Sequence, residues 1–391
     1  MSDVVIVGAK RTAIGSFLGQ FTGTPTPALG SAAIQGALAQ SGLAADQVDE
    51  VIMGCVLPAG LGQAPARQAM RAAGIPDAAG ATTVNKVCGS GMKAVMLAHD
   101  IIKAGSAKAV VAGGMESMTN APHLLNGSRT GVRYGSAEFL DHMAFDGLTN
   151  PYDGKAMGIF GDAACAKYGY DRATVDAFSA ESARRAQAAQ AAGAFAAEIV
   201  PVTVKTRKGE VLVDKDEEPG KIDLGKIPEL RPAFGKEGVL TAASSSKISD
   251  GAAALVVMSA AAAAAAGARP LARIVAHATH SQAPEWFTTA PVAALQSVLA
   301  KAGWSVTDVD LFEVNEAFAC VAMAPMTDLG IAHDKLNVNG GALALGHPIG
   351  CSGARLLVTL IHALQARGGK RGVASLCIGG GEATAVAIEL A

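Results

Sequence analysis

Apolar residues along this chain follow two alternating patterns. Short, continuous apolar runs predict buried strands. These runs occupy residues 4–9, 108–116, 311–314 and 372–382, and the last ends in glycines. Elsewhere apolar positions recur at steps of three and four residues, which predicts helices at 92–105 and 354–369. Strands that alternate with helices are typical of an α/β fold.

The chain contains part of itself twice. The segment LAQSGLAADQVDEV (38–51) aligns without gaps on LAKAGWSVTDVDLF (299–312), and each copy predicts a helix that ends near a glycine, a turn and a strand. Further on, Ser90-Gly91 is repeated as Ser352-Gly353, each followed by a helix and a strand ending in glycines. Two ordered matches predict two similar α/β halves that arose by duplication.

Residues 119–248 have a different character, because they are rich in Arg, Lys, Asp and Gly and show only fragmentary periodicity. We interpret them as an insertion packed on the first half, which the chain re-enters over 247–258 through a helical turn and a strand. The predicted domains are therefore an N-terminal half (1–118 and 249–270), a loop domain (119–248) and a C-terminal half (271–391).

The uncharged stretch from Gly251 to Ala268 is long enough to be weighed as a membrane span. It is mostly alanine, which contributes little transfer energy, and Ser259 and Gly267 interrupt it. We predict a strand at 254–258, an N-cap at Ser259, a helix of alanines and a C-cap at Gly267. The N-terminal apolar run follows an acidic residue, Asp3, and predicts a first strand rather than a signal peptide.

Composition narrows the class of protein. Only 4% of the residues are aromatic and 46 are glycine, which suits closely packed α/β layers. The net charge of -2 and the absence of charged blocks argue against a nucleic-acid partner. The six cysteines form no CxxC pair, so zinc and thioredoxin-like chemistry are not indicated. A chain of this size does not need disulfides, and we expect free thiols and a cytoplasmic location.

Four reactive side chains stand where predicted strands end. Cys88 follows the strand at 82–87 and begins a helix, whose dipole favours its thiolate. Asn315 ends the strand at 311–314, and Cys377 lies near the end of the last strand. His347 lies in the loop GHPIG, just before the helix that follows Cys351. In the repeat, Cys88 and the His347 loop occupy equivalent places, so a pseudo-twofold arrangement would bring them face to face.

Each of these residues has a structural explanation when taken alone. Cys88 and Cys377 could be core residues, His347 could satisfy a loop carbonyl, and Asn315 could cap a helix. The glycine-rich stretches lack the spacing of a phosphate-binding loop. The other cysteines are interpreted as structural, namely Cys55, Cys165, Cys320 and Cys351. It is the combination of the four that indicates a catalytic site.

That combination resembles the thiolase family, and the resemblance covers the whole chain. The motifs VCGSGMKAV, GGMESM, LRPAF, SDGAAALVVMS, NEAF, NVNGGALALGHPIGCSGAR and CIGGGEA occur in family order. The resemblance implies an α/β fold of duplicated halves in a five-layer arrangement with an inserted loop domain. It further implies acetyl-CoA, CoA and 3-oxoacyl-CoA as substrates and products, with no metal or redox cofactor, no nucleic acid and no membrane.

From the resemblance, Cys88 would be the acylated nucleophile and His347 its activating base. Cys377 would be the acid/base for the second substrate, and Asn315 would hold a water. One oxyanion site would combine that water with His347, and the other the backbone N–H groups of Cys88 and Gly379. The implied reaction is the reversible condensation of two acetyl-CoA molecules to acetoacetyl-CoA and CoA.

Family analogy also implies a coenzyme A cradle. The residues at matching positions are Leu148, Met157, Lys221, Phe234, Ala242, Ser246, Ala317 and Phe318. Three departures from the family pattern bear on CoA affinity and chain length: Ala156 stands where histidine is common, Gly220 and Lys221 where an arginine is common, and Phe287 where smaller residues are common.

The sequence is also compatible with alternative functions. The same chemistry could serve longer or dicarboxylic 3-oxoacyl-CoA substrates. A ketoacyl synthase would carry histidine or asparagine at Cys377, and a non-catalytic lipid-binding or scaffolding relative would have lost Cys88 or His347. A thiol-redox protein would pair Cys88 with Cys377. Family members of this kind assemble, so a homodimer or homotetramer is expected.

Overall fold

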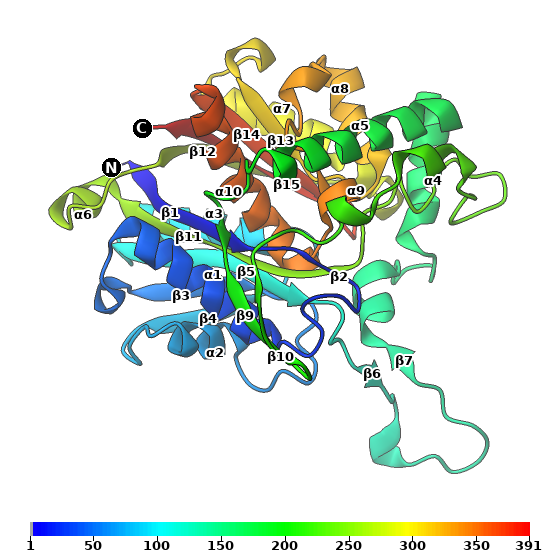
Figure 1. Cartoon of the computed structure of the whole chain (residues 1–391), viewed down its shortest axis with the longest axis horizontal. Coiled ribbons are helices and arrows are strands. Elements are labelled where there is room, and N and C mark those ends of the chain that lie inside the picture. The colour runs from blue at the N-terminus through cyan, green and yellow to red at the C-terminus, as the bar shows by residue number, and fades with distance from the viewer. Residues whose placement is uncertain (1–2) are drawn as a thin grey trace.

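One mixed β-sheet runs through the computed structural model, which describes residues 3–391 (Figure 1). Its main strands are, in spatial order, β13 (Leu311–Val314), β14 (Arg371–Ile378), β15 (Glu382–Leu390), β12 (Ala272–Ser281), β1 (Val4–Thr12), β11 (Ser249–Ser259), β5 (Ala109–Ser117), β3 (Glu50–Gly54) and β4 (Gly80–Val84). Two short strands extend it: β2 (Gly15–Ser16) pairs with β11, and β8 (Ile199–Val200) pairs with β1.

The strand order is the same on both sides of the sheet centre. Outward from β1 the neighbours are β11, β5 and β3, and outward from β12 they are β15, β14 and β13. In each half the first two pairings are antiparallel and the last is parallel. The halves meet through a short antiparallel contact, Val5 with Arg273 and Ile6 with Ala272. The duplication predicted from the sequence is therefore confirmed.

Helices form three layers around the two halves of the sheet. The helices are α1 (Thr26–Ser41), α2 (Pro65–Ala72), α3 (Ser90–Lys103), α4 (Met157–Tyr168), α5 (Arg172–Ala191), α6 (Ala260–Ala265), α7 (Ala290–Ala302), α8 (Ala319–Leu329), α9 (Ala342–Leu345) and α10 (Ile349–Arg367). Helices α1 and α2 cover the outer face of the N-terminal half, α7 covers that of the C-terminal half, and α3 and α10 lie together between the halves. This is the five-layer arrangement expected.

Shorter helical segments connect these elements. The 3-10 helices are Ala45–Gln47, Ser128–Thr130, Pro219–Lys221, Leu224–Glu229, Pro284–Thr289, Val306–Asp308 and His333–Lys335, and Met143–Leu148 is a π-helix. The repeat is visible at this level too. Helix α1 ends at Gly42 (φ 68°) and α7 at Gly303 (φ 69°), and both glycines adopt the left-handed C-cap conformation that the aligned sequences predict.

Helices α3 and α10 approach each other closely at their N-terminal ends. A Cβ on Gly353 would lie 2.5 Å from the backbone nitrogen of Met92, and one on Gly91 would lie 2.9 Å from the carbonyl oxygen of Gly350. The glycines of the repeated Ser-Gly pairs thus allow α3 and α10, one from each duplicated half, to pack closely. Helix α10 is long and apolar enough to cross a membrane by composition, but 89% of its apolar window is buried inside the protein. Its apolar character reflects its place between the two sheet halves.

Three local predictions were wrong. No helical turn forms at 247–248, and the chain enters β11 directly at Ser249. Helix α3 begins at Ser90 with Gly89 as its N-cap, so Cys88 lies just outside it. Helix α10 begins at Ile349, before Cys351, because Pro348 provides its N-cap. In contrast, the alanine stretch forms the predicted strand and short helix, with Ser259 accepting a hydrogen bond from the amide of Ala262 at 3.2 Å.

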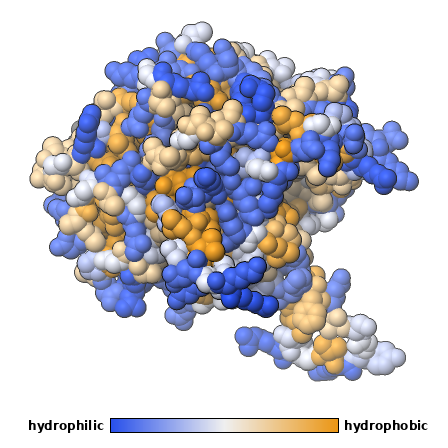
Figure 2. Space-filling view, in the orientation of Figure 1, coloured by the Kyte–Doolittle hydropathy of each residue, from blue (hydrophilic) through white to orange (hydrophobic). Residues whose placement is uncertain are grey.

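The segment 119–248 packs on both halves, not on the first alone as predicted. Apolar residues of α5 and of the segment after it join the N-terminal core, including Ala186 and Phe195. Helix α4 and Phe178 of α5 join the C-terminal core. The segment also contains the hairpin β9 (Val202–Thr206) with β10 (Gly209–Val213), and β6 (His123–Leu124) with β7 (Leu140–Asp141). Residues 125–139, between β6 and β7, form an arm that projects from the body and carries apolar residues on its surface (Figures 1 and 2).

Candidate active site

Cys88 lies in a tight turn between β4 and α3. Val87 has a φ of 46°, which is rare for a β-branched residue, so the backbone immediately before Cys88 is strained. The Ser90 hydroxyl holds this turn, because it donates to the carbonyl of Val87 (2.7 Å) and accepts from the amide of Lys86 (2.8 Å). Such strain persists only where the surroundings enforce it and is concentrated at functional sites.

Burial raises the pKa of the Cys88 thiol to about 11, against the opposing effect of two backbone N–H groups, those of Gly379 and of Cys88 itself. The sequence predicted that the N–H groups at this turn would favour the thiolate, and the two amides do lower the pKa, but burial raises it by more. Cys88 precedes the helix rather than opening it, and its desolvation outweighs the amide hydrogen bonds. Cys88 is therefore a thiol at rest, and it would have to lose its proton to act as a nucleophile.

Cys377 and Gly379 approach Cys88 from the opposite half of the protein. Cys377 is fully buried near the end of β14, and its pKa is well above the usual range because of burial and the nearby Cys88. Gly379 directs its N–H at the Cys88 sulfur. A Cβ on Gly89 would lie 2.3 Å from a methyl group of Ile378, so the turn around Cys88 sits directly against the end of β14.

His347 is buried and oriented by one serine. Its Nδ1 lies 2.5 Å from the hydroxyl of Ser352, and that hydroxyl donates to the carbonyl of Pro348 at 2.9 Å. Because the serine proton is used in this way, the ring must donate from Nδ1, which leaves Nε2 as an acceptor. Burial, followed by the positive charge of Arg355, lowers the pKa of His347 to about 3. The imidazole is thus neutral and its free nitrogen can accept a proton.

Asn315 faces His347 from the end of β13. Its side-chain nitrogen lies 3.4 Å from Nε2 of His347, and its backbone N–H donates to the carbonyl of Ser375 at 3.0 Å. The buried side-chain oxygen of Asn315 has no hydrogen-bond partner within residues 3–391. Asn315 does not cap α8, whose N-cap is Phe318, so the helix-cap explanation is excluded.

A buried carboxylate fixes the His347 loop to the N-terminal half. Glu116, at the end of β5, accepts from the amides of Val56 (2.9 Å), Leu57 (3.1 Å) and Gly350 (2.9 Å). The pKa of Glu116 rises to about 7 because burial outweighs these hydrogen bonds. Cys88 and Ile349, which follows the histidine loop, pack in the same small apolar cluster. The turn of Cys88 and the residues that follow His347 therefore pack in one cluster, and the face-to-face arrangement stays a prediction.

A pocket of about 290 Å³ opens beside His347. Five of the predicted coenzyme A residues line it, namely Leu148, Met157, Phe234, Ser246 and Phe318. Ala156 also lines it. A Cβ on Gly379 would lie 3.4 Å from the terminal methyl of Met157, so the pocket wall reaches the amide that contacts Cys88. Ala317 does not line this pocket, but its carbonyl accepts from the backbone N–H of Ser246 at 2.9 Å.

The two other predicted residues, Lys221 and Ala242, line a second pocket of about 270 Å³. Lys247 lines both pockets and connects them. The Lys221 amine lies 2.8 Å from Glu217 and 2.8 Å from the hydroxyl of Ser16, so its charge is already paired. A larger surface hollow of about 530 Å³ lies between α5 and α10, and none of the predicted site residues lines it.

Phe287 stands behind the first pocket rather than in it. Its buried ring packs edge-on against Phe318 at a centroid distance of 6.5 Å and against Phe160 at 6.4 Å. Phe318 in turn contacts Phe234 at 5.8 Å, also edge to face. This departure from the family pattern therefore adds a third ring behind the aromatic wall of the pocket without lining it.

Sequence reasoning missed three residues that shape the site. Ser352 orients His347, Glu116 anchors its loop, and Lys247 joins the pockets while its carbonyl accepts from the amide of His347 at 3.0 Å. A signal for Ser352 was present, since it repeats Ser90, which fastens the turn at Cys88 in the same way. Lys247 interrupts a run of serines before β11, and no spacing marks it as part of a pocket.

Comparisons with known proteins agree with this geometry. The thiolase N-terminal domain matches residues 4–261 and the thiolase C-terminal domain matches residues 268–390. An acetyl-CoA acetyltransferase of Chromobacterium violaceum is 51% identical over 99% of both chains. Acetyl-CoA acetyltransferase 2 of Arabidopsis thaliana is 49% identical over 99% of this chain and 97% of its own.

A solved structure shares the whole fold. The acetyl-CoA acetyltransferase of Bacillus anthracis superposes with a TM-score of 0.97 at 39% identity and covers 100% of this chain and 99% of its own. The duplicated halves, the cysteine turn, the histidine loop and both domain matches lead to one conclusion. The chain belongs to the thiolase family.

Proposed function

We propose that this chain is an acetyl-CoA acetyltransferase, which condenses two acetyl-CoA molecules reversibly to acetoacetyl-CoA and CoA. The observation that carries the proposal is the arrangement at Cys88: a partly buried thiol that receives two backbone N–H groups, next to a second thiol, Cys377. The full-length similarity to acetyl-CoA acetyltransferases supports it.

In the first half-reaction the Cys88 sulfur attacks the thioester carbonyl, and its proton passes to Nε2 of His347. The C–S bond to CoA then breaks. The departing CoA thiolate takes the proton of Cys377, which is a thiol at rest because its pKa is raised. The products are acetyl-Cys88, free CoA, an imidazolium at His347 and a thiolate at Cys377.

In the second half-reaction the Cys377 thiolate removes a proton from the methyl group of another acetyl-CoA. The resulting carbanion attacks the carbonyl of acetyl-Cys88 and forms the new C–C bond. The Cys88 sulfur leaves and recovers its proton from the His347 imidazolium, so every group returns to its starting state. Thiolysis is the same path in reverse, and neither direction uses a metal or a redox cofactor.

Two groups of donors are suited to the oxyanions that form. The N–H groups of Cys88 and Gly379 already point at the Cys88 sulfur. They can also donate to the oxygen of the acyl carbon that becomes bonded to this sulfur. The protonated Nε2 of His347 and a water held by the unpartnered oxygen of Asn315 are suited to the second oxyanion. These roles agree with those that the family resemblance implies.

Coenzyme A is proposed to run from the first pocket to the second. The apolar pocket beside His347 suits the pantetheine arm, and the second pocket, with Lys221, Lys226 and Lys247 on its wall, suits the phosphates. Lys247 is the best placed, because it lines both pockets. Residues 119–248 supply much of this cradle, in agreement with the predicted loop domain.

The proposal is tested by thiolysis kinetics with acetoacetyl-CoA and with six- and ten-carbon 3-oxoacyl-CoA. We expect the highest kcat/KM for acetoacetyl-CoA, because the packed rings of Phe234, Phe318 and Phe287 leave the pocket wall little room to move. A higher value for a longer chain would favour a 3-oxoacyl-CoA thiolase with the same mechanism. No activity with any of them would refute both.

We also propose that the chain forms a homodimer or homotetramer and acts in the cytoplasm. The projecting arm supports assembly, because it exposes large hydrophobic side chains to solvent: Val132, Tyr134 and Phe139. Light scattering coupled to size-exclusion chromatography would give the mass directly, and a monomer would contradict the proposal. The cytoplasmic location rests on the free cysteines and stays a prediction.

A further inference from the structure

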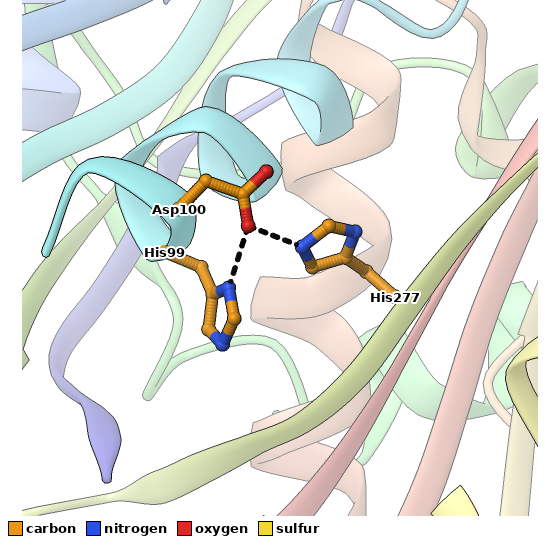
Figure 3. Close-up of side chains that lie close together, drawn as sticks. All are labelled: His99, Asp100 and His277. Carbon is orange, nitrogen blue, oxygen red and sulfur yellow. Dashed lines mark hydrogen bonds and ion pairs between the residues drawn. The ribbon is translucent and has the colours of Figure 1, made fainter. Parts of the chain in front are cut away.

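Two histidines and one aspartate meet on the side of the molecule where α3 approaches β12 (Figure 3). His99 and Asp100 come from α3, in the N-terminal half, and His277 comes from β12, in the C-terminal half. His99 lies about 14 Å along the helix from Ser90 at the usual helical rise, so the cluster is separate from the catalytic turn.

The three side chains point at a common centre. The same carboxylate oxygen of Asp100 lies 3.0 Å from Nδ1 of His99 and 2.8 Å from Nε2 of His277 (Figure 3). The two imidazoles stand nearly perpendicular, at 85°, with centroids 5.0 Å apart. All three potential ligand atoms lie within 4.8 Å of one another. Two ring nitrogens and one carboxylate oxygen at these separations can reach a single ion with small side-chain rotations.

The surroundings suit a bound ion as well. The imidazoles are mostly buried, with 14% and 18% of their side-chain surface exposed, whereas Asp100 is 50% exposed. The rings are therefore held by packing, while the carboxylate side gives an ion a path from solvent and leaves room for water ligands.

We propose that His99, Asp100 and His277 form a binding site for a divalent transition-metal ion, with Zn²⁺ the best match for two imidazoles and a carboxylate. Water completes the coordination, because the chain supplies three ligands. The ion joins α3 to β12 and so links the two duplicated halves away from the catalytic groups. The reaction proposed above does not use it, and no spacing of ligand residues along the chain predicted it.

One neighbour opposes the ion. Lys301 donates from Nζ to the backbone carbonyl of His277 at 3.1 Å and so places a positive charge beside the site. We therefore expect binding weaker than that of a closed structural zinc site, which usually has four protein ligands.

The test is a titration of the metal-free protein with Zn²⁺ alone, followed by a chromophoric chelator in competition. Catalytic thiols also bind zinc, so every protein carries Cys88→Ala and Cys377→Ala. In this background we compare the parent with Asp100→Asn, His99→Gln and His277→Gln. The control is His280→Gln on the same strand, whose ring lies 3.0 Å from the side-chain oxygen of Gln282 and not in the cluster.

We expect one site in the parent and in the control. Loss of a direct ligand is expected to weaken Zn²⁺ binding at least about 100-fold, the upper end of the effect of removing an outer-shell partner. Saturating Zn²⁺ should also raise the Tm of the parent but not of Asp100→Asn, which keeps the size of the side chain. Circular dichroism confirms that each variant is folded. Equal affinity in the parent and in the folded cluster variants, or no binding to the parent, would overturn the proposal.

Discussion

Replacing Ser352 with alanine tests whether His347 acts as the base in the tautomer inferred from the structure. Among residues 3–391, the hydroxyl of Ser352 is the only hydrogen-bond partner of Nδ1 of His347, at 2.5 Å. The same hydroxyl donates a hydrogen bond to the carbonyl of Pro348. Without it, either ring nitrogen can carry the proton, and the imidazolium that forms during attack loses a hydrogen-bond acceptor.

The magnitude follows from the charge on the ring in the transition state. A hydrogen bond to a charged group contributes about 1.5–3 kcal/mol. At about 1.4 kcal/mol for each factor of ten, this corresponds to a loss of roughly 10- to 150-fold in kcat/KM for thiolysis of acetoacetyl-CoA. The buried carbonyl and ring nitrogen also lose a partner, which should lower the free energy of unfolding by about 1–3 kcal/mol.

Ser41→Ala is the matched control. Ser41 is also buried in a helix and its hydroxyl donates to a carbonyl of the preceding turn, that of Leu38, at 2.8 Å, but it contacts no catalytic group and lines neither coenzyme A pocket. Both variants should lose stability by a similar amount in urea titration, and only Ser352→Ala should lose activity. Full activity in a folded Ser352→Ala protein would refute the assigned tautomer.

Four further predictions follow from named contacts. Asn315→Ala should lower kcat by about 100- to 1000-fold with little change in KM, since it removes an oxyanion partner; a change confined to KM would contradict this. Gly353→Ala should reduce Tm and activity together, because the new Cβ would overlap the backbone of Met92, and an unchanged Tm would show that α3 and α10 are not in close contact. The rate of Cys88 alkylation by iodoacetamide should rise about tenfold per pH unit toward pH 11, because the raised pKa leaves the thiolate a minor species below that value; a plateau below pH 8 would contradict it. Lys247→Met should raise KM for acetyl-CoA while leaving alkylation of Cys88 unchanged, and an unaltered KM would remove Lys247 from the CoA path.

Local sequence signals predicted much of the fold. Continuous apolar runs became β1, β5, β13 and β14, and the aligned glycines at 42 and 303 became helix ends. Strands and helix ends of this kind depend mainly on residues close together in the sequence, so the local hydrophobic pattern can predict them. The internal repeat added long-range information, because equivalent segments must occupy equivalent places.

Other features depend on contacts between distant parts of the chain. The bond between Glu116 and the amide of Gly350 joins residues 234 positions apart, and no spacing reveals it. The glycine at 350 was placed in a loop, yet it lies inside α10. Close packing requires it there, since a Cβ on Gly350 would lie 2.6 Å from the Glu116 carboxylate. The raised pKa of Cys88 has the same origin, because desolvation depends on the completed fold.

The most direct test of the catalytic account is intact-mass analysis after brief exposure to acetyl-CoA. Wild type, Cys88→Ala and Cys377→Ala are compared, because the account assigns acylation to Cys88 and proton transfer to Cys377. It predicts an acetyl adduct on wild type and on Cys377→Ala, and none on Cys88→Ala. An adduct that persists on Cys88→Ala, or its absence from all three, would contradict the assignment of Cys88 as the nucleophile.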